Sequence, residues 1–144
     1  KGVISPDRIR RYKKPDETER KGLVTSRVGQ GYYRQQILEK WNSKCPISGI
    51  NIKSILISSH IVPWSDCTDE ERLDVNNGIL LSPNFDSLFD RHLISFNDDG
   101  SILISHKISR QQRDALGLVE TIKIPIAEQM IPYLERHRQK FGES

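Results

Sequence analysis

The sequence contains few cysteines and no long apolar run, and each absence excludes a class of protein. Its 144 residues include two cysteines, Cys45 and Cys67, too few for a disulfide framework or a four-cysteine zinc site. We interpret them as free thiols in a reducing cytosol, with one disulfide as the alternative. No apolar run approaches the roughly 20 residues of a membrane helix, and the start shows no signal-peptide pattern. We therefore expect a cytoplasmic protein without membrane contact, held together by its own packing.

Positive charge is concentrated at the N-terminal end, although the net charge is only +3. Residues 1–40 hold 11 Lys/Arg against 5 Asp/Glu, and the remainder holds 11 against 14. Residues 1–27 are polar and contain two prolines, so we interpret them as a basic arm or linker before a single domain over 28–144. Such an arm suits a polyanionic partner, and a solvated tail is the alternative. The chain begins without Met, which fits a fragment of a longer protein or a processed chain.

Apolar spacing predicts a domain of mixed helices and strands. Tyr33, Ile37 and Trp41 recur every four residues, as on one face of a helix. The stretch KSILISSHI is apolar on both faces, which is typical of a buried strand. Ser82 and Pro83 are a hydroxyl cap and a first-turn proline, so they predict a helix start. The predicted elements are a helix over 32–41, strands over 53–61 and 79–82 joined by a polar loop over 63–78, a helix over 83–92, a hairpin over 93–105 around Asp-Asp-Gly, and helices over 109–117 and 131–142.

Two carboxylates share one face of the helix predicted over 83–92. Asp86 and Asp90 are four residues apart, a spacing that places both side chains on the same side. Their mutual repulsion would be removed by a hard cation, and Mg²⁺ suits such a site because it takes one or two carboxylates and keeps several waters. The alternative is that Asp86 belongs to the first-turn cap and Asp90 pairs with Arg91.

His60 lies near the end of the first predicted strand, three residues before a Pro-Trp turn. Its imidazole titrates near neutral pH and can take a proton from water. Taken alone, it is better explained as a satisfied polar group in or near the core, and Asn77, which precedes Gly78, as a turn residue. The spacing of three residues distinguishes these readings: His60, Asn77 and Asp86 form the pattern H-x16-N-x8-D, within HIVP, NNGILL and FDSLFD.

This pattern resembles the HNH nuclease family, and in particular its restriction-type members. HIVPW, NNGILLSP and LFDRHLISF have close counterparts there, and the resemblance spans about residues 28–105. It implies an α+β fold with a ββα-metal core over about 53–92, an additional β-hairpin and flanking helices.

The resemblance also implies roles for individual residues. His60 would be the general base, Asn77 would bond the loop backbone and keep His60 aimed, and Asp86 and Asp90 would bind one metal ion. Ser59 stands where relatives often have a metal-binding Asp or His, so it is a weak ligand. With fewer nitrogen ligands than such relatives, the site would favour Mg²⁺ or Mn²⁺ over Zn²⁺ or Ni²⁺. The family often has His at the third motif position, where Asp86 stands, and glycine is common at the position of His92.

The function implied is metal-dependent hydrolysis of double-stranded DNA by the catalytic domain of a restriction or defence enzyme, in a bacterial or archaeal cytoplasm. A catalytically inactive nucleic-acid-binding module derived from such a nuclease is the alternative, and a structural or interaction domain is a third reading. A homodimer and a missing DNA-recognition domain in a longer chain are further expectations. Candidate phosphate contacts are Arg8, Arg10, Arg11, Lys13, Lys14, Arg20, Lys21, Arg27, Arg34 and Arg91, the last with a helix-end salt bridge as its alternative.

Overall fold

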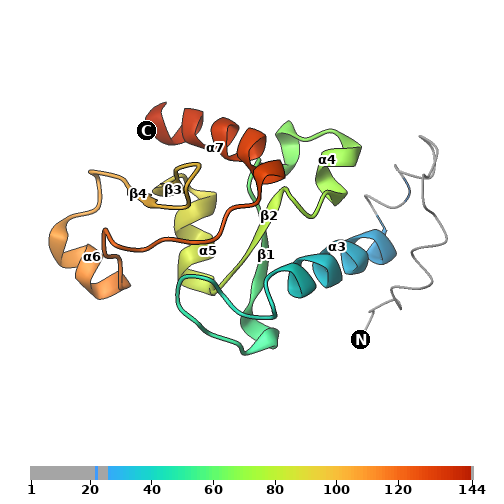
Figure 1. Cartoon of the computed structure of the whole chain (residues 1–144), viewed down its shortest axis with the longest axis horizontal. Coiled ribbons are helices and arrows are strands. Elements are labelled where there is room, and N and C mark those ends of the chain that lie inside the picture. Colours follow the sequence, from blue (N-terminus) through green and yellow to red (C-terminus); the bar gives the residue numbers. More distant parts are fainter. Residues whose placement is uncertain (1–21, 23–25, 144) are drawn as a thin grey trace.

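Two short antiparallel hairpins, with helices packed around them, make up the described part of the chain, which is Gly22 and residues 26–143 of the computed structural model (Figure 1). The mixture of helices and small sheets confirms the predicted α+β class. Arg8, Arg10, Arg11, Lys13, Lys14, Arg20 and Lys21 lie outside the described residues. The elements are α3 (Arg27–Lys40), η1 (Lys53–Ile55), β1 (Ile57–His60), η2 (Trp64–Asp66), α4 (Asp69–Leu73), β2 (Gly78–Leu81), α5 (Pro83–Asp90), β3 (Ile94–Phe96), β4 (Ile102–Ile104), α6 (Arg110–Leu116), η3 (Glu128–Met130) and α7 (Ile131–Glu143).

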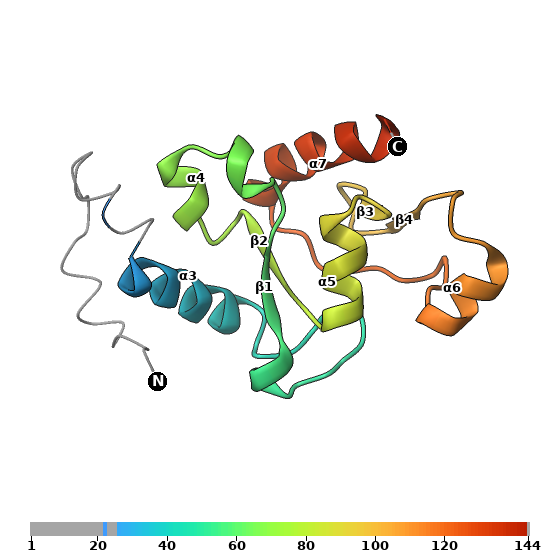
Figure 2. The same cartoon turned by 180° about the vertical axis from the view of Figure 1, so that it is seen from behind.

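The first hairpin and the helix after it form a ββα unit. β1 pairs with β2 so that His60 lies opposite Gly78 and Ile57 opposite Leu81. β2 is fully buried and leads directly into α5, which packs on β1. α3 covers the hairpin from the other side, as the two opposite views show (Figures 1 and 2). The hairpin is therefore held between two helices, and its two faces meet different neighbours.

The second hairpin, β3 with β4, supports the C-terminal helix. All three residues of β3 are buried, and α7 packs against this strand. The N-terminal end of α7 lies beside the loop that carries α4 (Figure 1). Leu134 and His137 are buried on its inner side. No helix in the described residues has both the length and the hydrophobicity that a membrane crossing needs.

The observed boundaries differ from the predicted ones in three places. α3 begins at Arg27, one turn before the prediction, because the Ser26 side chain accepts a hydrogen bond from the Gly29 amide and caps it. The first strand is limited to Ile57–His60, since residues 53–55 form a 3₁₀ turn. The segment expected to be a loop contains α4, whose capping box joins Thr68 and Glu71. Both cysteines are free thiols, as expected.

Candidate active site

The ring of His60 is fixed by a backbone carbonyl. Its Nε2 lies 2.8 Å from the carbonyl oxygen of Arg72, at the end of α4. A carbonyl can only accept, so Nε2 must carry the hydrogen. In the neutral ring the other nitrogen, Nδ1, then has a free lone pair. This tautomer is the one in which Nδ1 can accept a proton from a bound molecule.

Aromatic side chains enclose the same ring. Tyr33 of α3 stacks on it with 4.3 Å between ring centroids and 5° between planes, and Trp64 meets it edge-on at 5.6 Å. Burial lowers the pKa of His60 below its ordinary 6.5, and the bond to the Arg72 carbonyl opposes that shift only in part. The ring is therefore neutral at neutral pH, the state that a general base requires.

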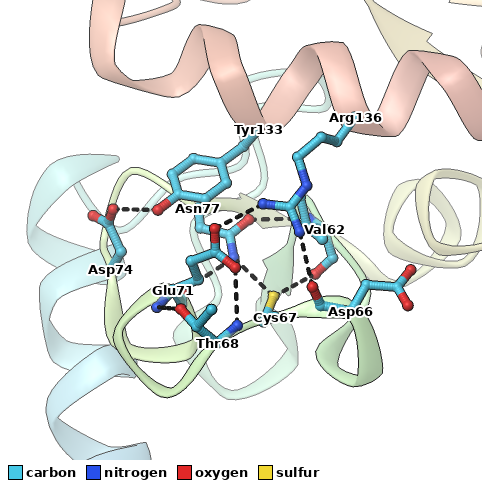
Figure 3. Close-up of polar contacts among 9 residues, drawn as sticks. All are labelled: Val62, Asp66, Cys67, Thr68, Glu71, Asp74, Asn77, Tyr133 and Arg136. Carbon is cyan, nitrogen blue, oxygen red and sulfur yellow. Dashed lines mark hydrogen bonds and ion pairs between the residues drawn. The ribbon is translucent and has the colours of Figure 1, made fainter.

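Asn77 ties together the loop that follows His60. It is fully buried, and its Oδ1 accepts a hydrogen bond from the Val62 amide at 3.0 Å. Its Nδ2 donates to the Glu71 carbonyl at 3.0 Å and to Cys67 Sγ at 3.3 Å. Figure 3 shows these bonds converging on the side chain. The contacts fit the predicted loop-holding role, since they fix the chain on both sides of α4.

The carboxylates lie on the other face of β1. The buried hydroxyl of Ser59 donates to Asp86 Oδ1, on the first turn of α5. Consecutive strand residues point to opposite faces, so Ser59 meets α5 while His60 meets α3 and α4. The roles assigned from the resemblance would bring the imidazole and the carboxylates to one ion; their contacts run to different elements, and the convergence stays a prediction.

The donor chemistry of this carboxylate face fits a hard cation, but the number of donors is small. Asp86 is half-buried and Asp90, one turn on, is exposed; together with Ser59 they offer only oxygen atoms, which Mg²⁺ and Mn²⁺ prefer. Among the described residues, no group of three or more His, Cys, Asp or Glu side chains could hold a metal ion. Two carboxylates are enough only for an ion that keeps most of its water, as Mg²⁺ does.

The predicted cationic contacts divide into bound and exposed side chains. Arg34 donates from Nη1 to the Leu56 carbonyl and from Nη2 to the Lys53 carbonyl, both at 2.8 Å. It therefore joins α3 to the segment before β1 and has fewer donors left for phosphate than the sequence suggests. Arg27 and Arg91 are exposed. The helix-end salt bridge considered for Arg91 does not occur among the ion pairs of the described residues.

A cleft of about 130 Å³ opens beside His60. Ser58 points to the same face of β1 as His60, and its buried Oγ has no hydrogen-bond partner among the described residues. A ligand in this cleft could use that unsatisfied hydroxyl. The cleft is lined by Gln30, Tyr33, Arg34, Ser58, His60, Trp64, Arg72 and Leu73.

Sequence reasoning missed three contributors to this site. Tyr33 was assigned only to the core stripe of a helix, and Arg72 contributes through its backbone carbonyl, which no residue pattern reveals. Trp64 was noted only as part of a turn. The capping-box pair Thr68 and Glu71 is the one signal that could have placed the start of a helix in the loop after His60; the last turn of that helix then leaves carbonyls without intrahelical partners.

His92 is held in a backbone conformation that suits glycine, the residue that the family resemblance leads us to expect at this position. Its φ is +59°, in the left-handed region that glycine enters without penalty. The ring stacks on His137 with 4.3 Å between centroids. This contact gives the side chain a packing role at the end of α5.

Comparison with known proteins agrees with the motif. Residues 45–97, which contain β1, β2, α5 and β3, match the sequence model of the HNH endonuclease family. No curated protein matches the chain. The matched segment includes His60, Asn77 and Asp86, supports nuclease action on nucleic acid, and agrees with the observed ββα unit. The match over residues 45–97 therefore supports the resemblance to the HNH endonuclease family on which the motif assignment depends.

Proposed function

We propose that this protein is a metal-dependent DNA endonuclease that hydrolyses phosphodiester bonds, acting as the catalytic domain of a restriction or defence enzyme. The observation that carries the proposal is the bond from His60 Nε2 to the Arg72 carbonyl. It leaves Nδ1 as the proton acceptor of a ring whose pKa is lowered by burial. A general base for water needs this combination of a free lone pair and neutrality near pH 7.

The proposed reaction is hydrolysis of the P–O3′ bond. Nδ1 of His60 takes a proton from water as the water oxygen bonds to phosphorus, and the bond from phosphorus to the 3′ oxygen breaks. The products are a 5′-phosphate and, after the leaving oxygen takes a proton from solvent, a 3′-hydroxyl. Asn77 keeps the loop in place so that the Arg72 carbonyl stays at Nε2.

Asp86 and Asp90 would hold Mg²⁺ or Mn²⁺, one ion per site, with Ser59 as a hydroxyl donor to Asp86. When bound, such an ion supplies positive charge that stabilises the developing charge on phosphate and leaving oxygen. Ser59 and His60 are consecutive, so base and carboxylates flank the same end of the hairpin.

Double-stranded DNA is the proposed substrate, and exposed cations are the proposed backbone contacts. Arg27 and Arg91 are exposed, and the basic arm adds charge of the same sign. Contacts of this kind position a duplex without reading its sequence. A separate recognition domain in a longer chain, or a homodimer for cutting both strands, belongs to this proposal, as does a bacterial or archaeal cytoplasm.

A second function has specific support: a nucleic-acid-binding module whose nuclease site is inactive. The support is that His60 and Asp86 face different elements and that the described residues contain no cluster of three metal-binding side chains. In this second function the fold and the cationic DNA contacts are the same, and only the cleavage reaction is absent.

Plasmid cleavage tests the proposed function. Supercoiled plasmid is incubated with the protein in Mg²⁺, Mn²⁺ or EDTA, beside His60→Ala. We expect cleavage that needs the metal and falls by about 10²–10⁴-fold in His60→Ala, the usual contribution of a general base. The matched control is His106→Ala, since His106 is exposed and lies outside the site.

The outcomes separate the two functions. Salt-sensitive plasmid binding by the unmodified protein, without cleavage in any metal, supports the inactive module. Full cleavage by His60→Ala contradicts the role of His60, whatever the metal requirement. Asp86→Asn, tested in the same series, should raise the metal concentration needed for half-maximal cleavage.

A further inference from the structure

The C-terminal helix α7 lies outside the family-matched segment, yet its side chains form hydrogen bonds and ion pairs with the loop that holds His60. Arg136 Nη1 is 2.7 Å from Glu71 Oε2, and Arg136 Nη2 is 2.8 Å from the Asp66 carbonyl oxygen. One guanidinium thus spans both ends of the segment from η2 to α4. Figure 3 shows Arg136 reaching down from α7 to these two acceptors.

Two further bonds from α7 reach the same loop. The Tyr133 hydroxyl donates to Asp74 Oδ2 at 2.6 Å, and Lys140 Nζ lies 2.7 Å from Asp66 Oδ2. The contacts of Tyr133, Arg136 and Lys140 with Asp66, Glu71 and Asp74 are called the α7 clamp below.

Glu71 is the point at which the clamp meets the site. Its Oε1 accepts from the Thr68 amide at 2.9 Å, and its carbonyl accepts from Asn77 Nδ2 at 3.0 Å. Its other carboxylate oxygen receives Arg136. The side chain and backbone of Glu71 are therefore fixed on three sides, and the next carbonyl in the chain is that of Arg72.

The clamp also holds the chain after Arg72. Asp74, bonded to Tyr133, accepts from the Asn76 amide through Oδ1 at 2.9 Å. The Arg72 carbonyl thus lies between two residues that α7 anchors. Because that carbonyl sets the tautomer of His60, the anchoring helix acts on the ring through the backbone.

We propose that Arg136 is a positioning residue of the nuclease site: through Glu71 it holds the Arg72 carbonyl against His60 and so selects the tautomer with a free Nδ1. The inference rests on the proposed function for its catalytic meaning. Its structural content, the tautomer of His60, can be measured whether or not the protein cleaves DNA.

The chain offers a matched control on the same helix. Arg138, two residues after Arg136, also donates to a carbonyl and pairs with a carboxylate, at 2.9 Å to Phe96 and 2.8 Å to Asp98. These partners lie on β3 and the turn after it, away from the loop. Arg136→Gln and Arg138→Gln therefore remove similar bonds from one helix, and only the first touches the clamp.

The experiment measures the imidazole ¹⁵N shifts of His60 by NMR in the full chain, assigned with His60→Ala. The unmodified protein and Arg138→Gln should show a single tautomer with hydrogen on Nε2. Arg136→Gln should show a mixture of tautomers. If the protein cleaves DNA, kcat of Arg136→Gln on a short duplex should fall about tenfold or more, as for other residues that orient catalytic groups, with KM little changed.

An unchanged single tautomer in Arg136→Gln overturns the inference. An equal change in Arg138→Gln also overturns it, because the effect would then come from general loosening of α7. Should Arg136→Gln fail to fold, Tyr133→Phe removes one hydroxyl of the clamp, and a tautomer mixture is again expected, whereas a single tautomer there counts against the proposal. Absence of cleavage by the unmodified protein contradicts the proposed function and leaves the tautomer result to decide the clamp.

Discussion

A histidine ring has two nitrogens, and in this protein the neighbour of one decides the chemistry of the other. His60 donates a hydrogen bond from Nε2 to the Arg72 carbonyl, and its Nδ1 keeps a free lone pair. In His137, by contrast, both nitrogens are bonded inside the protein, to Ser95 and Phe89. The same residue type is thus available for chemistry at one position and committed to structure at the other. Partners, rather than residue type, separate these roles.

Cleavage should depend on pH through His60. Burial lowers the pKa of this ring below its ordinary 6.5, so the neutral, base-competent form persists above that pH. The rate of plasmid cleavage at saturating metal should therefore be level above about pH 6.5 and fall as pH drops through the lowered pKa. The measurement is the cleavage rate from pH 4.5 to 8.5; a midpoint clearly above 6.5 would contradict this assignment of the base.

At the scale of elements, the sequence predicts the order strand, strand, helix, hairpin because each depends on local signals. Ser82 and Pro83 mark the start of α5, and the hairpin turn carries Asp-Asp-Gly. The orientation of His60 depends on how α3 and α4 dock against β1, so the pattern of residues around His60 could not give it. Alternation along Ser59–His60 does predict opposite faces, which agrees with the different partners of the two side chains.

α3 packs so closely on β2 that only glycine fits at position 78. A Cβ there would overlap the Tyr33 hydroxyl and lie 2.6 Å from Ile37 Cδ1. Tyr33 also bonds the Asn77 carbonyl at 2.8 Å and stacks on His60. Gly78→Ala should therefore push α3 away from the hairpin and lower the free energy of unfolding by about 1–3 kcal/mol. Because α3 carries Tyr33, the rate of DNA cleavage should fall as well.

Urea unfolding of Gly78→Ala and of a matched variant checks this prediction. Gly142→Ala, in α7, adds the same methyl group where nothing lies within 4 Å, so it should leave stability unchanged or slightly raise it. Equal stability of the two variants would mean that α3 does not need this close approach.

At the scale of the whole molecule, His137 joins three elements around one buried ring. It belongs to α7, its Nε2 lies 2.8 Å from the Phe89 carbonyl of α5, and its Nδ1 lies 2.7 Å from Ser95 Oγ on β3. The ring also stacks on Phe89 with 4.0 Å between centroids. The nuclease-family segment and the helix that carries the clamp are therefore joined through a group that can be protonated.

Stability should fall on acidification because of this ring. Burial, with smaller effects of His92 and Arg138, lowers the pKa of His137 to about 4, whereas the unfolded chain takes up the proton near 6.5. Between these values the unfolded state binds more protons, so the free energy of unfolding decreases as pH is lowered from about 6.5 to about 4 and is fully retained above 6.5. The difference corresponds to about 3 kcal/mol at 1.36 kcal/mol per unit.

Urea unfolding at pH 7 and pH 4 isolates this effect. His137→Gln should be less stable at pH 7, because it loses the stacked ring, but should lose about 3 kcal/mol less than the unmodified protein on going to pH 4. His106→Gln, at an exposed histidine, keeps His137. Its free energy of unfolding should therefore fall between pH 7 and pH 4 by as much as that of the unmodified protein. An equal loss in His137→Gln and the unmodified protein would show that acid destabilises this fold elsewhere, and that α7 stays docked by contacts other than this ring.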